Sequence, residues 1–381
     1  MNEFPRRSVS SLQTRRAFVR NLALGSAFVG SGAAGNLAAQ IGEATKGGER
    51  KLGVALMGLG YYASGELGPN LLETKLCRLA GVVTGSREKG AKWSRQYGFP
   101  EKNIWNYDTL HEIAGNPDID IVYVVTPNGL HAEHVAKVAA AGKHVICEKP
   151  MANSARDCDA MIAACRKANV KLSVGYRLHF DSNHIELDRL ARERDFGLLN
   201  RMSGEFSWTF TDRAWRIEKA LSGGGPLMDV GIYVIQAACR GAMGQPVAVT
   251  ARELPKTNPT LFNEVEEAIE WTMEFPGGVT CEASSSYARN ADRFRAEGPK
   301  GWIQFAPAYD YRGIETATSR GPMSFPVVHQ QALQMDDFAS CVLTGRDSPV
   351  PGSMGRDHMA IIEAIYRSAA EGGRRTEVRR G

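Results

Sequence analysis

The chain has 381 residues, of which 43% are hydrophobic and 23% are charged, so it has a globular composition and the length of roughly two domains. No apolar run of about 18 or more uncharged residues stands away from the N-terminus, which excludes a polytopic membrane protein. The net charge of +4 arises within residues 1–39, and the neutral remainder offers no basic surface of the kind that binds nucleic acid.

Residues 1–39 have the layout of a signal peptide. Arg15 and Arg16, followed by Phe18, resemble the twin-arginine export signal, and a short apolar stretch and then small residues come after them. The alternative is a disordered tail with a chance arginine pair. We expect residues 40–50 to be a polar linker. The twin-arginine export machinery would deliver the folded protein, with its cofactor, to the periplasm, and the mature form would have no membrane partner.

A glycine-rich motif directly follows the first apolar strand, which begins near residue 51. The motif reads Gly58-Leu59-Gly60-Tyr61-Tyr62-Ala63. Gly58 would permit a tight turn, Gly60 would let the backbone approach a pyrophosphate, and Ala63 would let the next helix pack close to the sheet. The positive N-terminus of that helix, expected to include residues 67–72, would stabilise the pyrophosphate. Glycine-rich turns are common, so the motif needs its context.

The second expected strand, residues 79–84, indicates which dinucleotide binds. An enzyme that uses NAD usually has a carboxylate at this strand tip for the ribose diol. Here no carboxylate stands at the tip itself, which is followed by Ser86, Arg87, Glu88 and Lys89. Arg87 and Lys89 can pair with a 2′-phosphate, so we predict NADP rather than NAD. The alternative is a solvated charged turn.

Two patterns divide the rest of the chain. Strands and helices alternate first, which predicts a Rossmann-type, doubly wound parallel sheet over residues 51–175, with strands at 120–125, 144–147 and 171–174 and helices at 130–141 and 155–168. Period-two segments follow, which predict a domain with a large open, mostly antiparallel sheet over residues 176–353, with strands within 202–210, 265–275, 278–287, 294–297 and 302–305. Helical spacing then predicts a C-terminal helix over residues 354–372.

Metal and disulfide chemistry are not expected. The seven cysteines form no Cys-x-x-Cys pair, and we interpret them as buried thiols. His131 and His134 lie three residues apart on an expected helix. With no third ligand at a suitable spacing, we predict no metal site.

Three further motifs make a resemblance specific. They read Thr126-Pro127-Asn128-Gly129-Leu130-His131, Cys147-Glu148-Lys149-Pro150 and Gly175-Tyr176-Arg177. With the glycine motif they resemble the Gfo/Idh/MocA oxidoreductase family over residues 51–370. The most similar branch is the exported glucose–fructose oxidoreductases, on the residues Trp215-Arg216, the run from Gly223 to Tyr233 and Glu264-Val265-Glu266-Glu267.

Two departures from that branch stand out. Its best-known member has a long proline-rich arm over the cofactor of a neighbouring subunit, whereas residues 40–50 contain no proline. Tyr233 also stands where many relatives have histidine. The first departure puts the arm-mediated tetramer and the locking of the cofactor by an arm in doubt.

The resemblance, together with the glycine motif and the strand tip, implies a set of NADP contacts. They are Gly58, Leu59, Gly60, Tyr61, Tyr62, Ser86, Arg87, Lys89, Pro127, Asn128, Leu130, His131, Glu148, Lys149, Arg177, Trp215 and Arg216. A structural salt bridge is the alternative for Glu148, and a core position is the alternative for Trp215. The family's Lys-Pro bond is often cis, and its open sheet often forms a homo-oligomer.

The expected catalytic residues are Lys149, Asp229 and Tyr233. The resemblance and the chemistry make Tyr233 the general acid/base. A phenol has an ordinary pKa of about 10, so it needs a nearby cation, which Lys149 would supply. Asp229 lies four residues before Tyr233, shares its helical face and would grip a sugar hydroxyl. Arg177 and His179 complete the expected substrate contacts, although His179 could instead be structural.

Export and NADP together predict how the enzyme turns over. Free NADP should be scarce outside the cytoplasm, so the simplest solution is a cofactor that never leaves. One aldose, such as glucose, would be oxidised at C1 to its lactone, and a second sugar, such as fructose, would be reduced to a polyol in a ping-pong cycle. The alternatives are a conventional NADP-dependent aldose dehydrogenase, an exported NAD-type glycosidase of the same family, and a non-catalytic sugar-binding protein.

Overall fold

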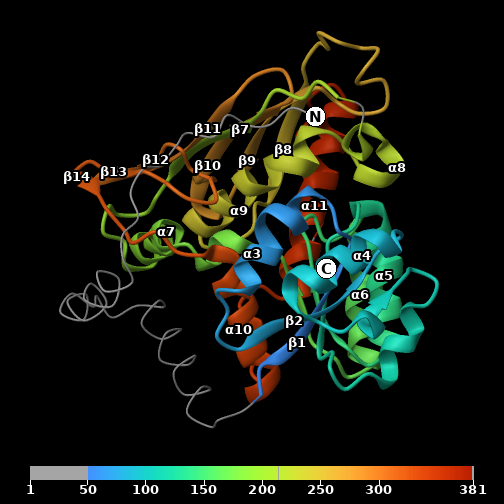
Figure 1. The fold of residues 1–381 in the computed structure, drawn as a ribbon. Helices are drawn as coiled ribbons and strands as arrows, with labels where there is room; N and C mark the ends of the chain where they lie inside the picture. Colours follow the sequence, from blue (N-terminus) through green and yellow to red (C-terminus); the bar gives the residue numbers. More distant parts are fainter. Residues whose placement is uncertain (1–49, 213, 380–381) are drawn as a thin grey trace, which may run out of the picture.

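The computed structural model describes residues 50–212 and 214–379, so the expected signal peptide and nearly all of the linker lie outside the described residues. The described strands form a six-stranded and a nine-stranded sheet, which Figure 1 shows as two stacked parts of the molecule. No helix in the described part of the chain combines the length and the apolar character that a membrane span requires.

The first sheet is parallel and has the order β3-β2-β1-β4-β5-β6. Its strands are β1 (Leu52–Met57), β2 (Cys77–Val83), β3 (Ile104–Trp105), β4 (Ile121–Val124), β5 (His144–Cys147) and β6 (Leu172–Val174). The strand order reverses between β1 and β4, and ligands of open parallel sheets bind at such a reversal. This topology confirms the predicted doubly wound sheet.

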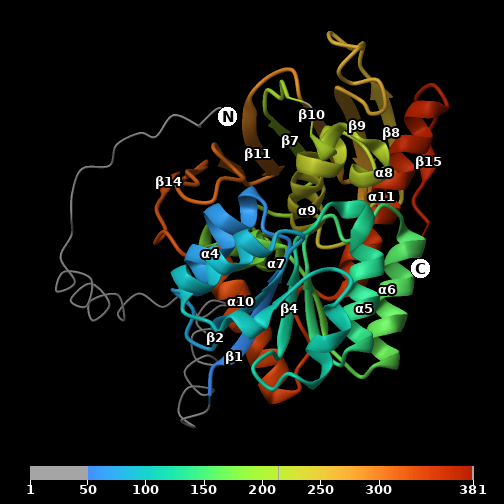
Figure 2. The same cartoon turned by 45° about the vertical axis from the view of Figure 1, so that its right-hand side comes forward.

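Helices cover both faces of this sheet. Val54 and Leu56 of β1 pack into one hydrophobic core with α3 (Gly68–Leu71), α4 (Arg87–Tyr97) and α10 (Gln330–Thr344). Ala55 and Met57 face the opposite core, with α5 (His131–Ala140) and α6 (Ala155–Lys167), which lie side by side in Figure 2. Helices on both faces explain why the strands are apolar on both sides.

The sequence did not predict α10, which lies within the residues expected for the second domain but packs on the first. The Asp336 carboxylate on α10 accepts hydrogen bonds from the backbone N–H of Lys75 and of Leu76, each at 2.8 Å. α11 (Gly352–Ala370) contacts α6 of the first domain and β8 of the second, as expected for a helix at their junction. α11 therefore joins the two domains.

The second sheet has the order β14-β13-β12-β11-β7-β10-β9-β8-β15. Only β7 and β10 are parallel among the described neighbours, so the predicted, mostly antiparallel sheet is confirmed. Its strands are β7 (Arg201–Ser207), β8 (Ala248–Glu253), β9 (Ala268–Glu274), β10 (Thr280–Ser286), β11 (Ala291–Gly298), β12 (Gly301–Phe305), β13 (Thr316–Thr318), β14 (Gly321–Met323) and β15 (Thr376–Glu377). The strand expected from residue 265 begins at 268, and β8 was not predicted.

One face of the second sheet is covered and the other is open. α7 (Ser182–Glu193) and α9 (Ile232–Gly241) lie between this sheet and the first domain (Figure 1). Ile269, Trp271 and Met273 are buried at alternate positions of β9, as predicted. A hollow of about 660 Å³ lies over β7, β8, β9 and β10. Self-association through the open sheet stays a prediction.

Candidate active site

The predicted cofactor and catalytic residues gather at the carboxyl ends of β1, β2, β4, β5 and β6, where an open parallel sheet binds its ligands. The glycine motif follows β1, Ser86 to Lys89 follow β2, and residues 127–131 follow β4. Lys149 follows β5 in a cis Lys149–Pro150 pair, as the resemblance implied. The second domain faces this edge with Trp215, Arg216, Asp229 and Tyr233.

A single helical segment presents Asp229 and Tyr233 to the edge. A wide turn over Leu227–Gly231 continues into α9, which begins at Ile232. The Glu266 carboxylate accepts hydrogen bonds from the first N–H groups of this segment, on Gly225 at 2.9 Å and on Leu227 at 3.1 Å. A carboxylate at a helix N-terminus stabilises the helix, because it satisfies N–H groups that have no helical partner.

Tyr366 and two glycines fix the position of this cap. The Tyr366 hydroxyl donates to Glu266 at 2.9 Å. A Cβ on Gly225 would come within 2.2 Å of the Glu266 carbonyl oxygen, and one on Gly224 within 1.9 Å of the Tyr366 hydroxyl. Glycine is therefore needed at both positions of the predicted turn, because its backbone lies so close to Glu266 and Tyr366. The sequence singled out Glu266 only as part of a motif and did not assign it this position.

Lys149 lies between Asp229 and Tyr233. Its Nζ donates to the backbone carbonyl of Asp229 at 2.6 Å and lies 3.8 Å from the Oδ1 of the same residue. The same Nζ is 4.7 Å from the centre of the Tyr233 ring. The structure thus brings together the three residues that the sequence predicted as catalytic.

Asp229 is held more tightly than expected. Its Oδ2 accepts hydrogen bonds from Trp208 Nε1 at 3.3 Å and from the Tyr287 hydroxyl at 3.1 Å, and it lies 3.3 Å from Arg216 Nε. Burial disfavours the carboxylate, but Arg216, Lys149 and these hydrogen bonds outweigh burial and lower the pKa of Asp229. The residue is an ionised anchor for Lys149, and only Oδ1 is left to bind a sugar hydroxyl.

Arg177 is a second cation in contact with the Tyr233 ring. Its guanidinium carbon is 5.0 Å from the centre of the Tyr233 ring and 4.3 Å from that of Tyr311. Burial disfavours its charge, but a guanidinium pKa is so high that Arg177 stays a cation even when buried. Tyr233 is therefore flanked by two cations, Lys149 and Arg177.

The glycine motif fits a dinucleotide. Gly58 has φ +99°, and a Cβ there would lie 2.9 Å from the carbonyl oxygen of Val125. A Cβ on Gly60 would meet nothing within 4 Å, so its backbone borders open space. These are the features that let a loop turn tightly and accept a pyrophosphate against its backbone. Residues 61–71 form the helical turns that follow.

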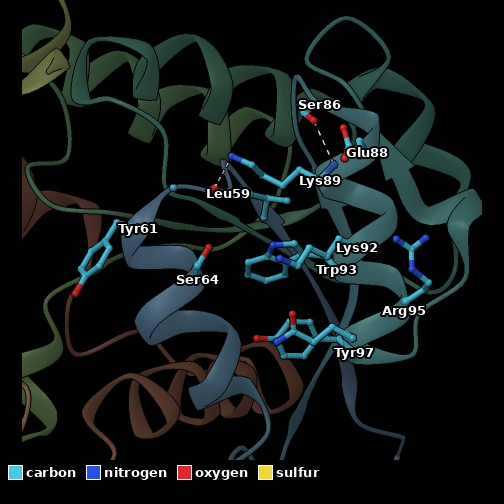
Figure 3. A pocket seen from close by; sticks show the side chains of 12 residues that line it. Leu59, Tyr61, Ser64, Ser86, Glu88, Lys89, Lys92, Trp93, Arg95 and Tyr97 are labelled. Carbon is cyan, nitrogen blue, oxygen red and sulfur yellow. Dashed lines mark hydrogen bonds between the residues drawn. The ribbon is translucent and has the colours of Figure 1, made fainter. Parts of the chain in front are cut away.

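A pocket of about 730 Å³ lies between this loop and α4. Ser86 caps α4 by accepting from the backbone N–H of Lys89 at 3.2 Å, and Lys89 Nζ donates to the carbonyl of Leu59 at 3.3 Å (Figure 3). Lys92, one turn further along α4, also lines the pocket. Arg87 is exposed on the first turn of α4 and lies outside that lining. The cations that line this pocket are Lys89, which was predicted, and Lys92 and Arg95, which were not. Lys89 and Lys92 are the candidates to meet a 2′-phosphate.

This geometry makes a testable prediction about the cofactor. Replacing Lys89 and Lys92 together with alanine should weaken NADP binding by about tenfold or more and leave NAD binding nearly unchanged, because only NADP carries the 2′-phosphate. Titrating each dinucleotide into cofactor-free protein measures both Kd values. Lys137→Ala, which removes an exposed lysine of α5, is the matched control. Equal losses for NADP and NAD would contradict the assignment.

Some predicted contacts are turned inward. Both ring nitrogens of His131 are within hydrogen-bond distance of backbone carbonyls, Nδ1 of Pro150 at 3.0 Å and Nε2 of Thr126 at 2.8 Å, and the ring is fully buried. His131 thus supports the Lys149–Pro150 turn through the Pro150 carbonyl. The Glu148 carboxylate accepts from the Tyr123 hydroxyl at 2.6 Å, and burial raises its pKa. A Cβ on Gly175 would come within 2.5 Å of that carboxylate, which explains the glycine of the third motif.

The remaining predicted contacts vary in exposure. Asn128 donates to the carbonyl of Ser222 at 2.9 Å and so joins the two domains, while Pro127 and Leu130 are half-buried beside it. His179 stacks on Tyr176 at 6.1 Å, and burial lowers its pKa well below the ordinary value. Tyr61 is 79% exposed.

Aromatic residues of the second domain complete the wall around Asp229. The half-buried Trp215 ring lies 4.8 Å from the Arg216 guanidinium carbon. Trp208 packs edge to face on Tyr287, and both donate to Asp229. The sequence assigned neither Trp208 nor Tyr287 to the site, because an isolated aromatic residue within or beside a strand gives no signal. No cluster of metal-ligating side chains occurs within residues 50–212 and 214–379.

The fold and this edge define an oxidoreductase built on a Rossmann domain. Residues 52–176 match the family model described as "Oxidoreductase family, NAD-binding Rossmann fold", and residues 184–304 match the GFO/IDH/MocA C-terminal domain. The chain therefore belongs to the Gfo/Idh/MocA oxidoreductase family, as the motifs predicted.

Individual relatives agree with the family. The crystal structure of aldose-aldose oxidoreductase from Caulobacter crescentus is 43% identical, with a TM-score of 0.83, and the match covers 86% of this chain and 100% of that one. The 1,5-anhydro-D-fructose reductase of Ensifer adhaerens is 30% identical over 77% of this chain and 89% of its own length. The D-xylose 1-dehydrogenase [NADP(+)] of Haloarcula marismortui is 25% identical over 83% of this chain and 90% of its own.

Proposed function

We propose that the protein is an NADP-dependent sugar oxidoreductase that keeps its cofactor through the catalytic cycle. It would oxidise an aldose at C1 to the lactone and then reduce a second sugar to a polyol in the same site. The observation that carries the proposal is the meeting of Lys149, Asp229 and Tyr233 at the carboxyl edge of the Rossmann sheet. The 43% identity to an aldose-aldose oxidoreductase supports it.

The chain's own residues supply the acid–base chemistry. A bound nicotinamide would supply the hydride chemistry. Asp229 orients the Lys149 ammonium through its carbonyl and carboxylate, and this cation would hold the oxygen at the sugar's C1. Tyr233, between the Lys149 and Arg177 cations, would accept the hydroxyl proton during oxidation and return a proton to the carbonyl oxygen during reduction.

Two further parts of the proposal concern the cofactor and the second sugar. Lys89 and Lys92 support NADP, and two similar dehydrogenases are named as NADP-dependent enzymes. The aldose-aldose relative favours a second aldose over fructose as the acceptor. The paired Arg15 and Arg16 support export to the periplasm, where a retained cofactor would remove the need for a supply of free NADP.

A spectrum of the purified and desalted protein tests the proposal. We expect a nicotinamide absorbance band that rises when glucose alone is added and falls when a second sugar, xylose or fructose, follows. No band, with activity only on added NADP, would contradict cofactor retention. A band that no free sugar changes would contradict the sugar redox cycle and favour the glycosidase or binding-protein alternatives.

A conventional NADP-dependent aldose dehydrogenase is the second candidate. The similarity to two D-xylose 1-dehydrogenases over at least 77% of the chain favours it. It predicts continuous lactone formation that is proportional to added free NADP. The proposed cycle instead predicts that product formation depends on the second sugar and not on free NADP.

A further inference from the structure

One loop of the second domain reaches the first domain beside the catalytic residues. Residues 306–315 connect β12 to β13, and we call them the 306–315 loop. Its base is fixed, because the Asp292 carboxylate accepts from the backbone N–H of Ala308 at 2.7 Å and of Tyr309 at 2.9 Å. The carbonyl of Ala308 is 2.8 Å from His184 Nε2. These hydrogen bonds attach the base of the loop to the second domain.

Arg177 ties this loop to the first domain. The residue follows β6 in the Gly-Tyr-Arg motif and is 2% exposed. Its guanidinium donates to the carbonyl of Asp310 at 3.0 Å and also to that of Tyr309. These bonds place the Tyr311 ring 4.3 Å from the guanidinium carbon. A cation facing an aromatic ring at this distance is an attractive contact, and burial strengthens it.

Tyr311 also contacts the glycine motif. Its ring centre lies 5.9 Å from that of Tyr62, which stands between Gly60 and Ala63. Burial raises the pKa of both phenols, so both rings are neutral beside the Arg177 cation. Tyr62, Tyr311, Arg177 and Tyr233 thus form a continuous row from the glycine-rich loop to the expected acid/base. A dinucleotide with its pyrophosphate at that loop and its reactive ring near Lys149 would span the same two ends.

We propose that Tyr311 is a cofactor-retaining residue, which holds the nicotinamide end of the dinucleotide by closing the glycine-rich loop against the second domain. The inference rests on the proposed function, in which the cofactor stays bound. It assigns retention to the chain's own 306–315 loop, whereas an N-terminal arm performs it in the best-known member of the branch. To release the dinucleotide, the protein must break the contacts of Tyr311 with Tyr62 and Arg177.

The dissociation rate of NADPH tests this assignment. Loaded protein is mixed with excess NADP, and the loss of bound NADPH fluorescence is followed with time. We expect Tyr311→Ala and Tyr311→Leu to release NADPH about tenfold faster than the unmodified protein, because both lack the aromatic face. Tyr311→Phe keeps that face and should release it within about twofold of the unmodified rate. Tyr311→Leu fills most of the space, so it serves if Tyr311→Ala does not fold.

Two results would overturn the proposal: an unchanged rate in Tyr311→Leu, or an equal acceleration in Tyr311→Leu and Tyr311→Phe. The test compares the NADPH release rates of variants, so its outcome does not depend on whether the proposed function is correct. If the unmodified protein exchanges NADPH within seconds, cofactor retention fails. The ratio would still show whether Tyr311 sets the rate.

Discussion

Tyr233→Phe is expected to lower kcat by roughly 100- to 10,000-fold in both the oxidation and the reduction of sugars, which is the usual range for loss of a positioned acid/base. The change removes one hydroxyl and keeps the ring. The contacts of that ring with Phe206 at 5.6 Å and Tyr309 at 6.0 Å therefore remain, and the fold should not change. Steady-state kinetics measure the loss, and the absorbance of the desalted variant reports whether it still holds its cofactor.

Tyr309→Phe is the matched control for this experiment. Tyr309 is a fully buried tyrosine next to Tyr233, and its hydroxyl has no hydrogen-bond partner among the described residues. Loss of that hydroxyl should leave kcat within about twofold of the unmodified value, because no hydrogen bond is lost when phenylalanine replaces Tyr309. Comparable activity in Tyr233→Phe and the unmodified protein would refute the assignment of Tyr233.

The first domain could be predicted from the sequence because its signals are local. An apolar strand that runs directly into Gly58 and Gly60 is typical of a dinucleotide-binding turn, and the structure shows why each glycine is needed. Strand and helix alternation then determines the handedness and the layers. Lys149 and Tyr233 are 84 residues apart, and only the resemblance placed them together. The distance of 4.7 Å from Lys149 Nζ to the centre of the Tyr233 ring agrees with that placement.

α10 shows why other parts could not be predicted. Its buried residues include Gln334, Asp336 and Asp337 as well as the apolar Met335 and Phe338, so polar side chains interrupt its apolar pattern. Each of these three side chains has a polar partner outside the helix. Gln334 donates to Tyr123 at 2.8 Å, Asp336 accepts from Leu76, and Asp337 pairs with Arg346. A pattern rule predicts that such residues are exposed, because it cannot identify partners outside the helix, and those of Gln334 and Asp336 lie far away in the sequence.

The candidate site had the same limitation. The expected role of Asp229 in binding a sugar hydroxyl stays a prediction, and the groups that hold its Oδ2 were not predicted. Two hydrogen-bond donors, Trp208 and Tyr287, and the Arg216 cation converge on that oxygen from distant segments. Tyr311 lies in an irregular loop, where neither period nor motif marks a residue. Local sequence can predict which elements carry the chemistry, whereas the groups that support it come from loops and strands that only the tertiary fold assembles.

Lys149→Met should also lower kcat by roughly 100- to 10,000-fold, because it removes the cation beside Tyr233 and the group expected to hold the sugar oxygen. Methionine keeps the length of the side chain, and Arg216 still pairs with Asp229, so the carboxylate is not left alone. The control is Lys143→Met. Lys143 immediately precedes β5, at the opposite end of the strand that Lys149 follows, and its Nζ donates to the carbonyl of Asn116 at 2.9 Å.

The two lysines separate a catalytic loss from a structural one. Lys143→Met should lower the free energy of unfolding by about 1 kcal/mol and leave kcat unchanged, because it removes one hydrogen bond far from the carboxyl edge. Lys149→Ala offers a second readout, since added methylamine can enter the space left by the side chain and restore a cation there. Partial recovery of kcat with methylamine would identify the charge as the active feature. Full activity in Lys149→Met would show that Tyr233 works without this cation and would leave Arg177 as the group that polarises the phenol.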